Sequence, residues 1–137
     1  MARVEDLAYI AGVIDGEGSI GVYSTSKCKS STLQVVINMT DQEAINLAYS
    51  MFGGKLYSQV GRAGDRRLYR WIVTGKRAQE VLVLIKPFIR VKRLQLEMAL
   101  TFPISTQGVT LSDADKYLRQ VIDFRLREMK RPNLKES

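Results

Sequence analysis

An apolar stretch near the amino terminus, residues 7–18, ends in residues that are unfavourable at a helix end. Up to Ile14 it is apolar enough for a buried helix, and it finishes in Asp-Gly-Glu-Gly, with carboxylates at Asp15 and Glu17. Carboxylates at this end face the negative pole of the helix macrodipole, and the last helix carbonyls lack partners. Such a group of oxygens suits a hard divalent cation, which prefers oxygen ligands. The stretch therefore predicts a cation site where the first helix ends.

Small residues form a stripe along the same predicted helix. Ala8, Gly12 and Gly16 recur every four residues on one face, and Ala11 lies beside them. Small residues at this spacing let a second helix backbone approach closely. The stripe has two interpretations, which are tight packing inside one protomer and packing between two protomers.

Composition restricts the chemistry and indicates the partner. The 137 residues fit one domain, 1–137, and contain no histidine, which excludes histidine-based nucleases and most zinc sites. A formal net charge of +7 favours a polyanionic partner such as nucleic acid. No apolar run is long enough to span a membrane, and no signal-peptide pattern is present. We expect an intracellular protein, in a prokaryotic cytoplasm or an organelle, that is not secreted and has no membrane partner.

The hydrophobic period changes along the chain in a way that predicts an α+β domain. After Gly18 the period becomes two, which indicates strands, and it later returns to the helical period. Runs of strands set between helices favour one four-stranded antiparallel sheet with extra helices at the carboxyl end. The predicted elements are a helix to about 18, strands 19–27 and 33–39, a helix capped by Thr40 or Asp41 and stopped at Gly53, strands 55–60 and 66–73, and helices from about 76 to 87, from about 88 to 102, and from about 112.

Residues 10–18 resemble the signature of LAGLIDADG homing endonucleases. The predicted order of elements also matches the αββαββα arrangement of that family over nearly the whole chain. The resemblance implies a double-strand DNA endonuclease, with an intron-associated role, that cuts a long near-palindromic site by metal-dependent phosphodiester hydrolysis. The matching residues are Ala11, Gly12, Ile14, Asp15 and Gly18, while Ile10 and Val13 are apolar replacements, Gly16 replaces alanine, and Glu17 replaces the second aspartate.

The resemblance implies a metal site at the end of the first helix. In the family the second acid of the motif binds the metal, and the residue before it offers a backbone carbonyl. Here these are Glu17 and Gly16, and the expected cofactor is Mg²⁺. Asp15 is expected to shape the helix end. The number of metal ions stays open.

The resemblance also implies a basic residue and a polar residue near the scissile phosphate. Residues 87–92 resemble the family segment that brings a basic residue to the active site, which makes Lys92 the candidate, with Arg90 and Arg93 as alternatives. Its charge would polarise water or stabilise the phosphate. Asp41 and Gln42 stand where the family carries a polar residue that orders water. A simple helix cap is an equally good interpretation of Asp41.

One copy of the motif supplies one acidic site, whereas cutting both strands of a duplex needs two. The resemblance therefore implies a homodimer and a target with twofold symmetry. Divalent cations would relieve the repulsion between the two Glu17 side chains. The predicted interface residues are Ala8, Ala11, Gly12, Asp15 and Gly16.

Polar and basic residues share one face of the predicted sheet, in phase with Glu17. Arginine and lysine can read guanine in a DNA major groove, and glutamine or asparagine can read adenine. An ordinary solvated face is the other interpretation. The predicted DNA-binding residues are Ser19, Gly21, Tyr23, Thr25, Lys27, Gln34, Asn38, Lys55, Tyr57, Gln59, Arg66 and Arg70.

Other functions also fit the sequence. The same fold could serve as an RNA maturase that binds its own intron RNA, or as a DNA-binding regulator that does not cut. A basic scaffold domain would bind nucleic acid without sequence preference. A rival nuclease pattern, Asp123 with Glu128 and Lys130, needs a strand, but it lies in a stretch with helical periodicity. We therefore interpret this stretch as a basic helix that is either solvated or in contact with phosphate.

Overall fold

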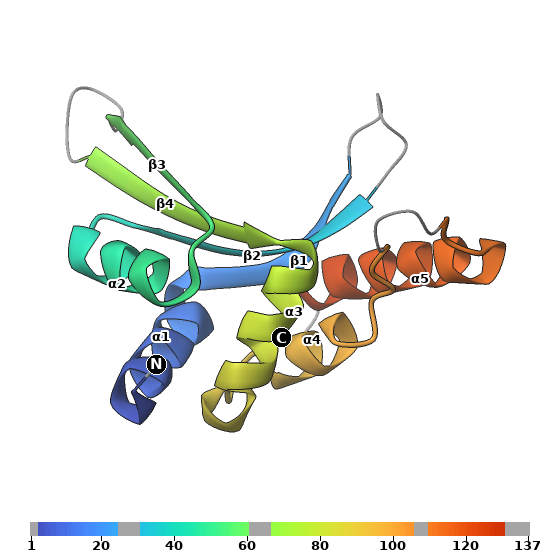
Figure 1. Cartoon of the computed structure of the whole chain (residues 1–137), viewed down its shortest axis with the longest axis horizontal. Coiled ribbons are helices and arrows are strands. Elements are labelled where there is room, and N and C mark those ends of the chain that lie inside the picture. The colour runs from blue at the N-terminus through green and yellow to red at the C-terminus, as the bar shows by residue number, and fades with distance from the viewer. Residues whose placement is uncertain (1–2, 25–30, 61–66, 106–109, 131–137) are drawn as a thin grey trace, which may run out of the picture.

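The structure is a computed structural model, and it describes residues 3–24, 31–60, 67–105 and 110–130. All helices lie on one side of a twisted four-stranded sheet (Figure 1). The elements in chain order are α1 (Val4–Glu17), β1 (Gly18–Ser24), β2 (Ser31–Met39), α2 (Gln42–Phe52), β3 (Lys55–Val60), β4 (Arg67–Thr74), α3 (Gly75–Ile85), the 3₁₀ turn η2 (Lys86–Phe88), α4 (Arg93–Ala99) and α5 (Asp113–Lys130).

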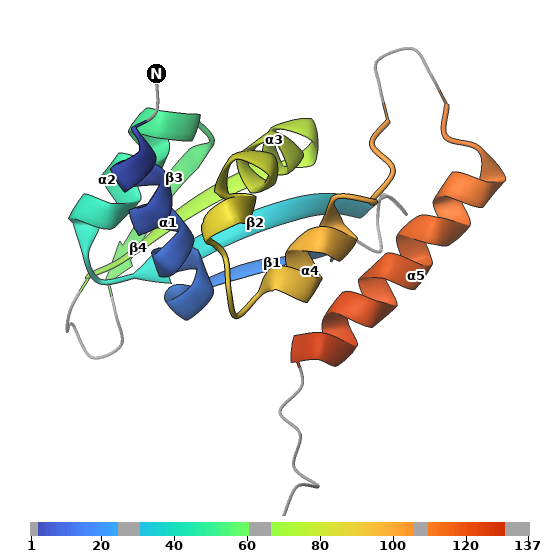
Figure 2. The ribbon, with the colours of Figure 1, turned by 90° about the horizontal axis from the view of Figure 1, so that it is seen from below.

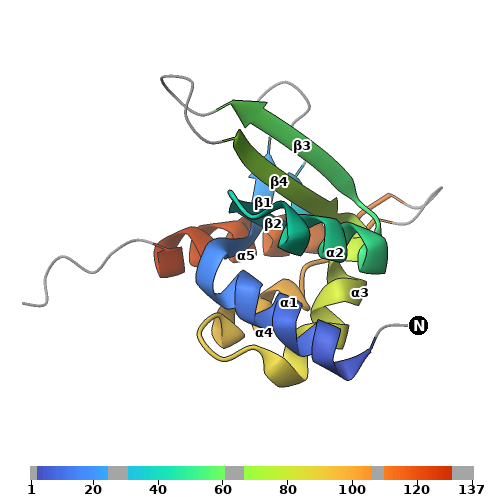
Figure 3. The ribbon, with the colours of Figure 1, turned by 90° about the vertical axis from the view of Figure 1, so that its left-hand side faces the viewer.

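The sheet has the order β1-β2-β4-β3, and every neighbouring pair is antiparallel. Under it, α1 and α3 contact β2, while α4 and α5 contact β1 at the sheet edge (Figure 2). Viewed from the side, the strands form one layer and the helices the other (Figure 3). The predicted α+β class and the αββαββα order with additional carboxyl-terminal helices are confirmed.

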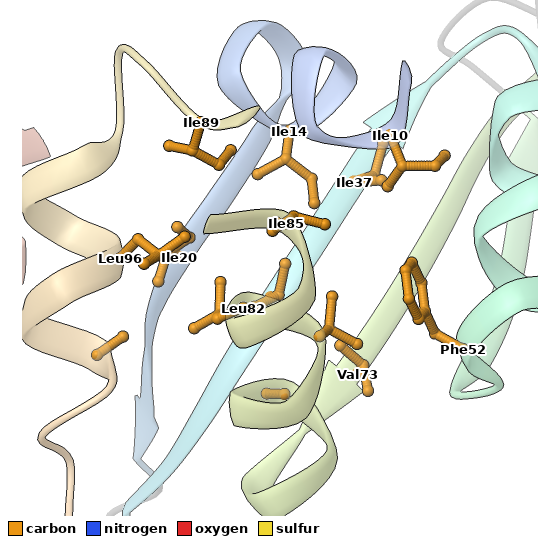
Figure 4. Close-up of a cluster of buried hydrophobic side chains, with 14 of the residues drawn as sticks. Ile10, Ile14, Ile20, Ile37, Phe52, Val73, Leu82, Ile85, Ile89 and Leu96 are labelled. Carbon is orange, nitrogen blue, oxygen red and sulfur yellow. The ribbon is translucent and has the colours of Figure 1, made fainter. Parts of the chain in front are cut away.

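The core lies between the sheet and the helices. Along β2, Leu33, Val35 and Ile37 alternate toward the helices and are fully buried. Ile14 of α1 and Leu82 of α3 belong to the same buried cluster (Figure 4). Burial of such side chains contributes about 1.5–3 kcal/mol each, which holds α1 against the sheet. No helix of the described residues lies on the opposite face of the sheet (Figure 3).

The junction between α1 and β1 is tight and depends on Gly18. A Cβ atom added at Gly18 would lie 2.8 Å from the Cα of Ile14 and 3.0 Å from the carbonyl oxygen of Val36. Both neighbours are backbone atoms, so they cannot move aside as a flexible side chain can. Glycine at this position lets the chain pass from α1 directly into the sheet.

The chain between α3 and α4 differs from the sequence prediction. A helix from about 88 to 102 was expected, but the described α4 covers only Arg93–Ala99. Ile89 is extended, with φ −78° and ψ 137°, and a turn follows at 91–92. The prediction was wrong because the backbone N–H groups of this segment bind the Asp15 carboxylate, which lies outside any local sequence pattern.

Other predicted boundaries agree closely with the structure. The Asp41 side chain accepts a hydrogen bond from the Glu43 N–H at 2.9 Å, as expected for the cap of α2. The last helix forms as predicted, from Asp113 to Lys130. The described part of β1 ends at Ser24. The predicted end of this strand at 27, the hairpin turn after it and the predicted turn at 61–65 therefore fall outside the described residues. Within the described residues, no helix combines the length and apolarity needed to span a bilayer.

Candidate active site and nucleic-acid interface

Glu17 is the last residue of α1, and its side chain is exposed. Its carboxylate forms no ion pair with any residue that the structure describes. Just before it, the carbonyl oxygen of Ile14 accepts the N–H of Gly18, and that of Asp15 accepts the Lys92 ammonium. Gly16 is also exposed at this tip. The helix end thus exposes both Gly16 and the acidic residue Glu17.

Lys92 lies in the segment between η2 and α4, and its side chain points to the end of α1. Its ammonium nitrogen is 2.7 Å from the Asp15 carbonyl oxygen. The alternatives behave differently: Arg90 is exposed, and the Arg93 guanidinium donates to the Lys86 carbonyl oxygen at 3.5 Å. Of these three basic side chains, Lys92 is the one bonded at the helix end that carries Glu17.

Asp15 is engaged inside the protomer through its side chain. Its carboxylate accepts backbone N–H groups from Arg90 at 2.7 Å, Val91 at 3.2 Å and Lys92 at 3.0 Å. Burial alone would raise the pKa of Asp15, but the hydrogen bonds from Arg90, Lys92 and Val91 and the positive charge of Lys92 bring its pKa below the ordinary value of 3.8. The side chain therefore stays a carboxylate at neutral pH.

The small-residue stripe lies largely on the outside of the protomer. Ala8, Gly12 and Gly16 are exposed, and a Cβ atom added at Gly12 or Gly16 would meet no atom within 4 Å. Ala11, also predicted for the interface, is fully buried in the protomer core. Packing inside one protomer therefore does not explain the glycines, because nothing in the described structure covers them.

Asp41 and Gln42 stand at the start of α2, and both are exposed. The only hydrogen bond of the Asp41 side chain among the described residues is the cap bond to Glu43. The structure thus accounts for Asp41 as a helix cap. A water-ordering role for either residue stays a prediction.

The uncovered face of the sheet is hollowed. A concavity of about 780 Å³ lies over it. Seven of the predicted DNA-binding residues line the concavity, namely Tyr23, Gln34, Asn38, Lys55, Tyr57, Gln59 and Arg70. Ser19, half-buried in β1, and Gly21, which is buried there, do not line it. Thr25, Lys27 and Arg66 fall outside the described residues.

One row of side chains crosses three strands at the centre of this face. Asn38 of β2 pairs with Arg70 of β4, and Arg70 pairs with Tyr57 of β3. Side chains directly opposite in a sheet have Cβ atoms about 4.5–5.5 Å apart, so the row forms one continuous strip. The strip places an amide, a guanidinium and a phenol in line, so that hydrogen-bond donors and acceptors lie side by side on this face.

Two basic residues outside the predicted DNA-binding set also reach the sheet. Arg77, from α3, lines the concavity and donates to the Phe52 carbonyl oxygen at 3.0 Å. The ammonium of Lys130, at the end of α5, lies against Gly21, which is buried. Burial and the nearby positive charges of Arg127 and Lys92 lower the pKa of Lys130, while Asp123 raises it. The sequence indicated that α5 is a basic helix, but only the tertiary fold brings Arg77 and Lys130 to the sheet.

The donors at the α1 tip fit a hard cation. Glu17 supplies a carboxylate and Gly16 a backbone oxygen, and magnesium commonly takes one or two carboxylates and completes its shell with water or phosphate. Among the residues that the structure describes, no three acidic or cysteine side chains gather into one cluster. One protomer thus offers a partial set of ligands at an exposed tip.

The α1 helix ends in an exposed acid and packs under an open, hollowed four-stranded sheet, which places the protein in the α+β class with its described helices on one face of an antiparallel sheet. No protein-family model matches the chain, and no curated protein sequence does. Solved structures do match. One is the homing endonuclease I-CvuI bound to DNA with magnesium present and the DNA uncleaved, with 15% identity, a TM-score of 0.71, and coverage of 97% of this chain and 88% of that chain.

Two further neighbours belong to the same group. The archaeal intron-encoded homing endonuclease I-Vdi141I, complexed with DNA, has 17% identity, a TM-score of 0.70, and coverage of 97% of this chain and 89% of that chain. The LAGLIDADG homing endonuclease I-GzeII, in complex with a DNA target, has 18% identity, a TM-score of 0.60, and coverage of 90% of this chain and 44% of that chain. The chain therefore has the LAGLIDADG homing endonuclease fold, as the resemblance at residues 10–18 predicts.

Proposed function

We propose that the protein is a homing endonuclease that cuts both strands of a specific DNA site as a homodimer with Mg²⁺. The observation that carries this proposal is the arrangement at the end of α1. There an exposed Glu17, free of ion pairs among the described residues, shares the helix end with the Lys92 ammonium. Metal-dependent phosphodiester hydrolysis needs an acidic group to bind the metal and a positive charge to stabilise the phosphate.

Each side chain at the tip has a distinct task. Glu17 and the Gly16 carbonyl would hold the cation, which when bound lowers the pKa of a water molecule and neutralises phosphate charge. Lys92 would place its ammonium against a phosphate oxygen and stabilise the charge that builds up there. Because Asp15 accepts both the backbone N–H and the ammonium of Lys92, the Lys92 charge stays close to the helix end.

The exposed stripe on α1 supports a homodimer. Gly12 and Gly16 leave room for a second helix backbone, and Ala8 extends the same face. If two α1 helices pack there around a twofold axis, the two Glu17 tips come together, one for each DNA strand. A twofold dimer binds a near-palindromic site best. The exposed Glu17 carboxylates would then share or flank bound cations.

The hollowed sheet face supports sequence-specific DNA binding. Arg70 and Lys55 can donate to guanine, and Asn38, Gln34 and Gln59 can pair with adenine. The net charge of +7 adds attraction to the phosphate backbone. The strands would follow the major groove on each side of the cleavage site.

The test uses the full-length chain and the intronless version of the locus that encodes it. Wild type is expected to make one double-strand break with Mg²⁺ and none with EDTA. Glu17→Gln should bind the same duplex within about threefold and cut at least about 10³-fold more slowly, because it loses a metal-binding charge. Glu43→Gln, at an exposed position on α2, is the matched control and should cut normally.

Equal cutting by Glu17→Gln would overturn the proposal. Tight binding of the intron RNA without any DNA break would replace the nuclease with a maturase. Sequence-blind, salt-sensitive binding of every duplex would reduce the protein to a basic scaffold.

A further inference from the structure

Asp15 joins two segments that are far apart in the chain. Its carboxylate accepts the N–H groups of Arg90, Val91 and Lys92, which lie 75, 76 and 77 residues further along. Its own carbonyl oxygen accepts the Lys92 ammonium at 2.7 Å. Together these four hydrogen bonds hold the 90–92 backbone and the Lys92 ammonium at the end of α1.

The segment that Asp15 binds has little other support. It lies between η2 and α4, outside regular secondary structure. Ile89 anchors one side in the core, whereas Val91 is 77% exposed on the other. Lys92 occupies the cap position of α4 without a side-chain cap bond. Among the described residues, the three N–H groups at 90–92 find their acceptors in the Asp15 carboxylate alone.

We propose that Asp15 is a positioning residue of the active site, which acts through Lys92. By holding the 90–92 backbone against the end of α1, it keeps the Lys92 ammonium at the tip that carries Glu17. This inference rests on the proposed nuclease function. It also gives Asp15 a task inside its own protomer, which differs from the interface role predicted from the sequence.

The chemistry of the site explains why a carboxylate is needed here. An ionised carboxylate is purely an acceptor, with two oxygens for three converging N–H donors. An asparagine would turn an NH₂ group toward at least one of those donors. Hydrogen bonds to an ionised acceptor are also about twice as strong as neutral ones. Asp15→Asn should therefore loosen the segment without changing the size of the side chain.

The decisive experiment is a double-mutant cycle on cleavage. Single-turnover rates at the mapped site are measured for wild type, Asp15→Asn, Lys92→Met and the double variant. Asp15→Asn should cut roughly 10–100-fold more slowly, with DNA affinity in EDTA within about threefold of wild type. In the Lys92→Met background, adding Asp15→Asn should slow cleavage by less than about threefold, because the effect of Asp15 passes through Lys92. Asp6→Asn, near the other end of α1, is the control and should cut normally.

Hydrogen–deuterium exchange gives a readout that does not depend on cleavage. Peptides covering 89–93 should exchange at least about tenfold faster in Asp15→Asn, while peptides from the core strand β2 should not change. If Asp15→Asn is unfolded at the assay temperature, Asp15→Glu takes its place, since it keeps the charge and shifts the carboxylate by one methylene. The same cycle and the same peptides are then measured.

The outcomes separate this inference from the proposed function. If wild type makes no break, or Glu17→Gln cuts as fast as wild type, the nuclease assignment fails. If wild type cuts, but the losses from Asp15→Asn and Lys92→Met multiply in the double variant, only the positioning role fails. Unchanged exchange at 89–93 would overturn the positioning role in either case.

Discussion

The ammonium nitrogen of Lys92 lies 2.7 Å from the backbone carbonyl oxygen of Asp15, in the last turn of α1. That turn contains no basic residue of its own. A cation at the carboxyl end of a helix is stabilised by the macrodipole, by about 0.3–1 kcal/mol near a surface. Lys92 therefore supplies from another segment the charge that α1 lacks, and the same contact brings the ammonium to the Glu17 end of the helix.

Replacing Lys92 should separate chemistry from binding. Lys92→Met keeps most of the side-chain length and removes the charge, so cleavage should fall about 10²–10³-fold while DNA affinity changes little. Single-turnover cleavage and filter binding on the mapped site measure the two effects. Lys116→Met, exposed on α5, is the control. If Arg90→Met or Arg93→Met removes activity and Lys92→Met does not, the role passes to that arginine.

A bulky residue in the stripe should block assembly without harming the protomer. Gly12 is exposed, and a Cβ there meets nothing within 4 Å, so Gly12→Leu should keep or raise the melting temperature of the protomer. The leucine would hold two α1 helices apart. Sedimentation with magnesium and duplex should show a dimer for wild type and a monomer for the variant. A wild type that stays monomeric under these conditions would contradict the homodimer.

The central row of the sheet should contribute to affinity and to base recognition. Arg70 is exposed between Asn38 and Tyr57, so Arg70→Ala should weaken binding of the target by about 1–3 kcal/mol if the guanidinium reads a base. A phosphate contact would instead weaken all sequences alike and lower the salt slope by about one. Titrations at several salt concentrations, on target and on scrambled duplex, distinguish the two. Unchanged affinity on both would exclude Arg70 from the interface.

Two glycines of the signature, on either side of Glu17, should respond oppositely to alanine. A Cβ at Gly18 would lie 2.8 Å from the Ile14 Cα, so Gly18→Ala should destabilise the fold by about 1–3 kcal/mol. A Cβ at Gly16 meets nothing within 4 Å, so Gly16→Ala should leave the protomer at least as stable. Urea unfolding of both variants measures the difference. Equal stability of the two would mean that the α1–β1 junction relaxes freely.

The Asp15 carboxylate should make stability depend on acid pH. Its pKa in the folded chain is below the ordinary 3.8, because hydrogen bonds from Arg90, Lys92 and Val91 outweigh burial. Its contribution is therefore complete above pH 3.8 and is lost as the pH falls through the folded pKa. The difference in unfolding free energy between wild type and Asp15→Asn should shrink over that range, since other carboxylates cancel in the comparison. A difference that is constant with pH would contradict this.

The regular elements could be read from the sequence because their causes are local. Period-two alternation in β2 and β4 gave both the strands and the face on which Asn38 and Arg70 lie, and the cap at Asp41 and the glycine stop at Gly53 bounded α2. The signature at 10–18 indicated the fold that the solved structures confirm. The roles of the site residues stay predictions, although the structure now places most of them.

Contacts between distant segments were beyond any local pattern. The helix expected from about 88 is interrupted because a carboxylate from α1 takes its N–H groups, and Ala11 turns inward while its neighbours on the stripe stay exposed. Local hydrophobic periodicity indicates which side chains are buried, but it compares residues only a few positions apart and so carries no information on contacts between distant segments. The contact of Lys92 with the Asp15 carbonyl oxygen and the contact of Lys130 with Gly21 both join segments that are distant in sequence. These segments meet only after α1, α4 and α5 have packed against the sheet.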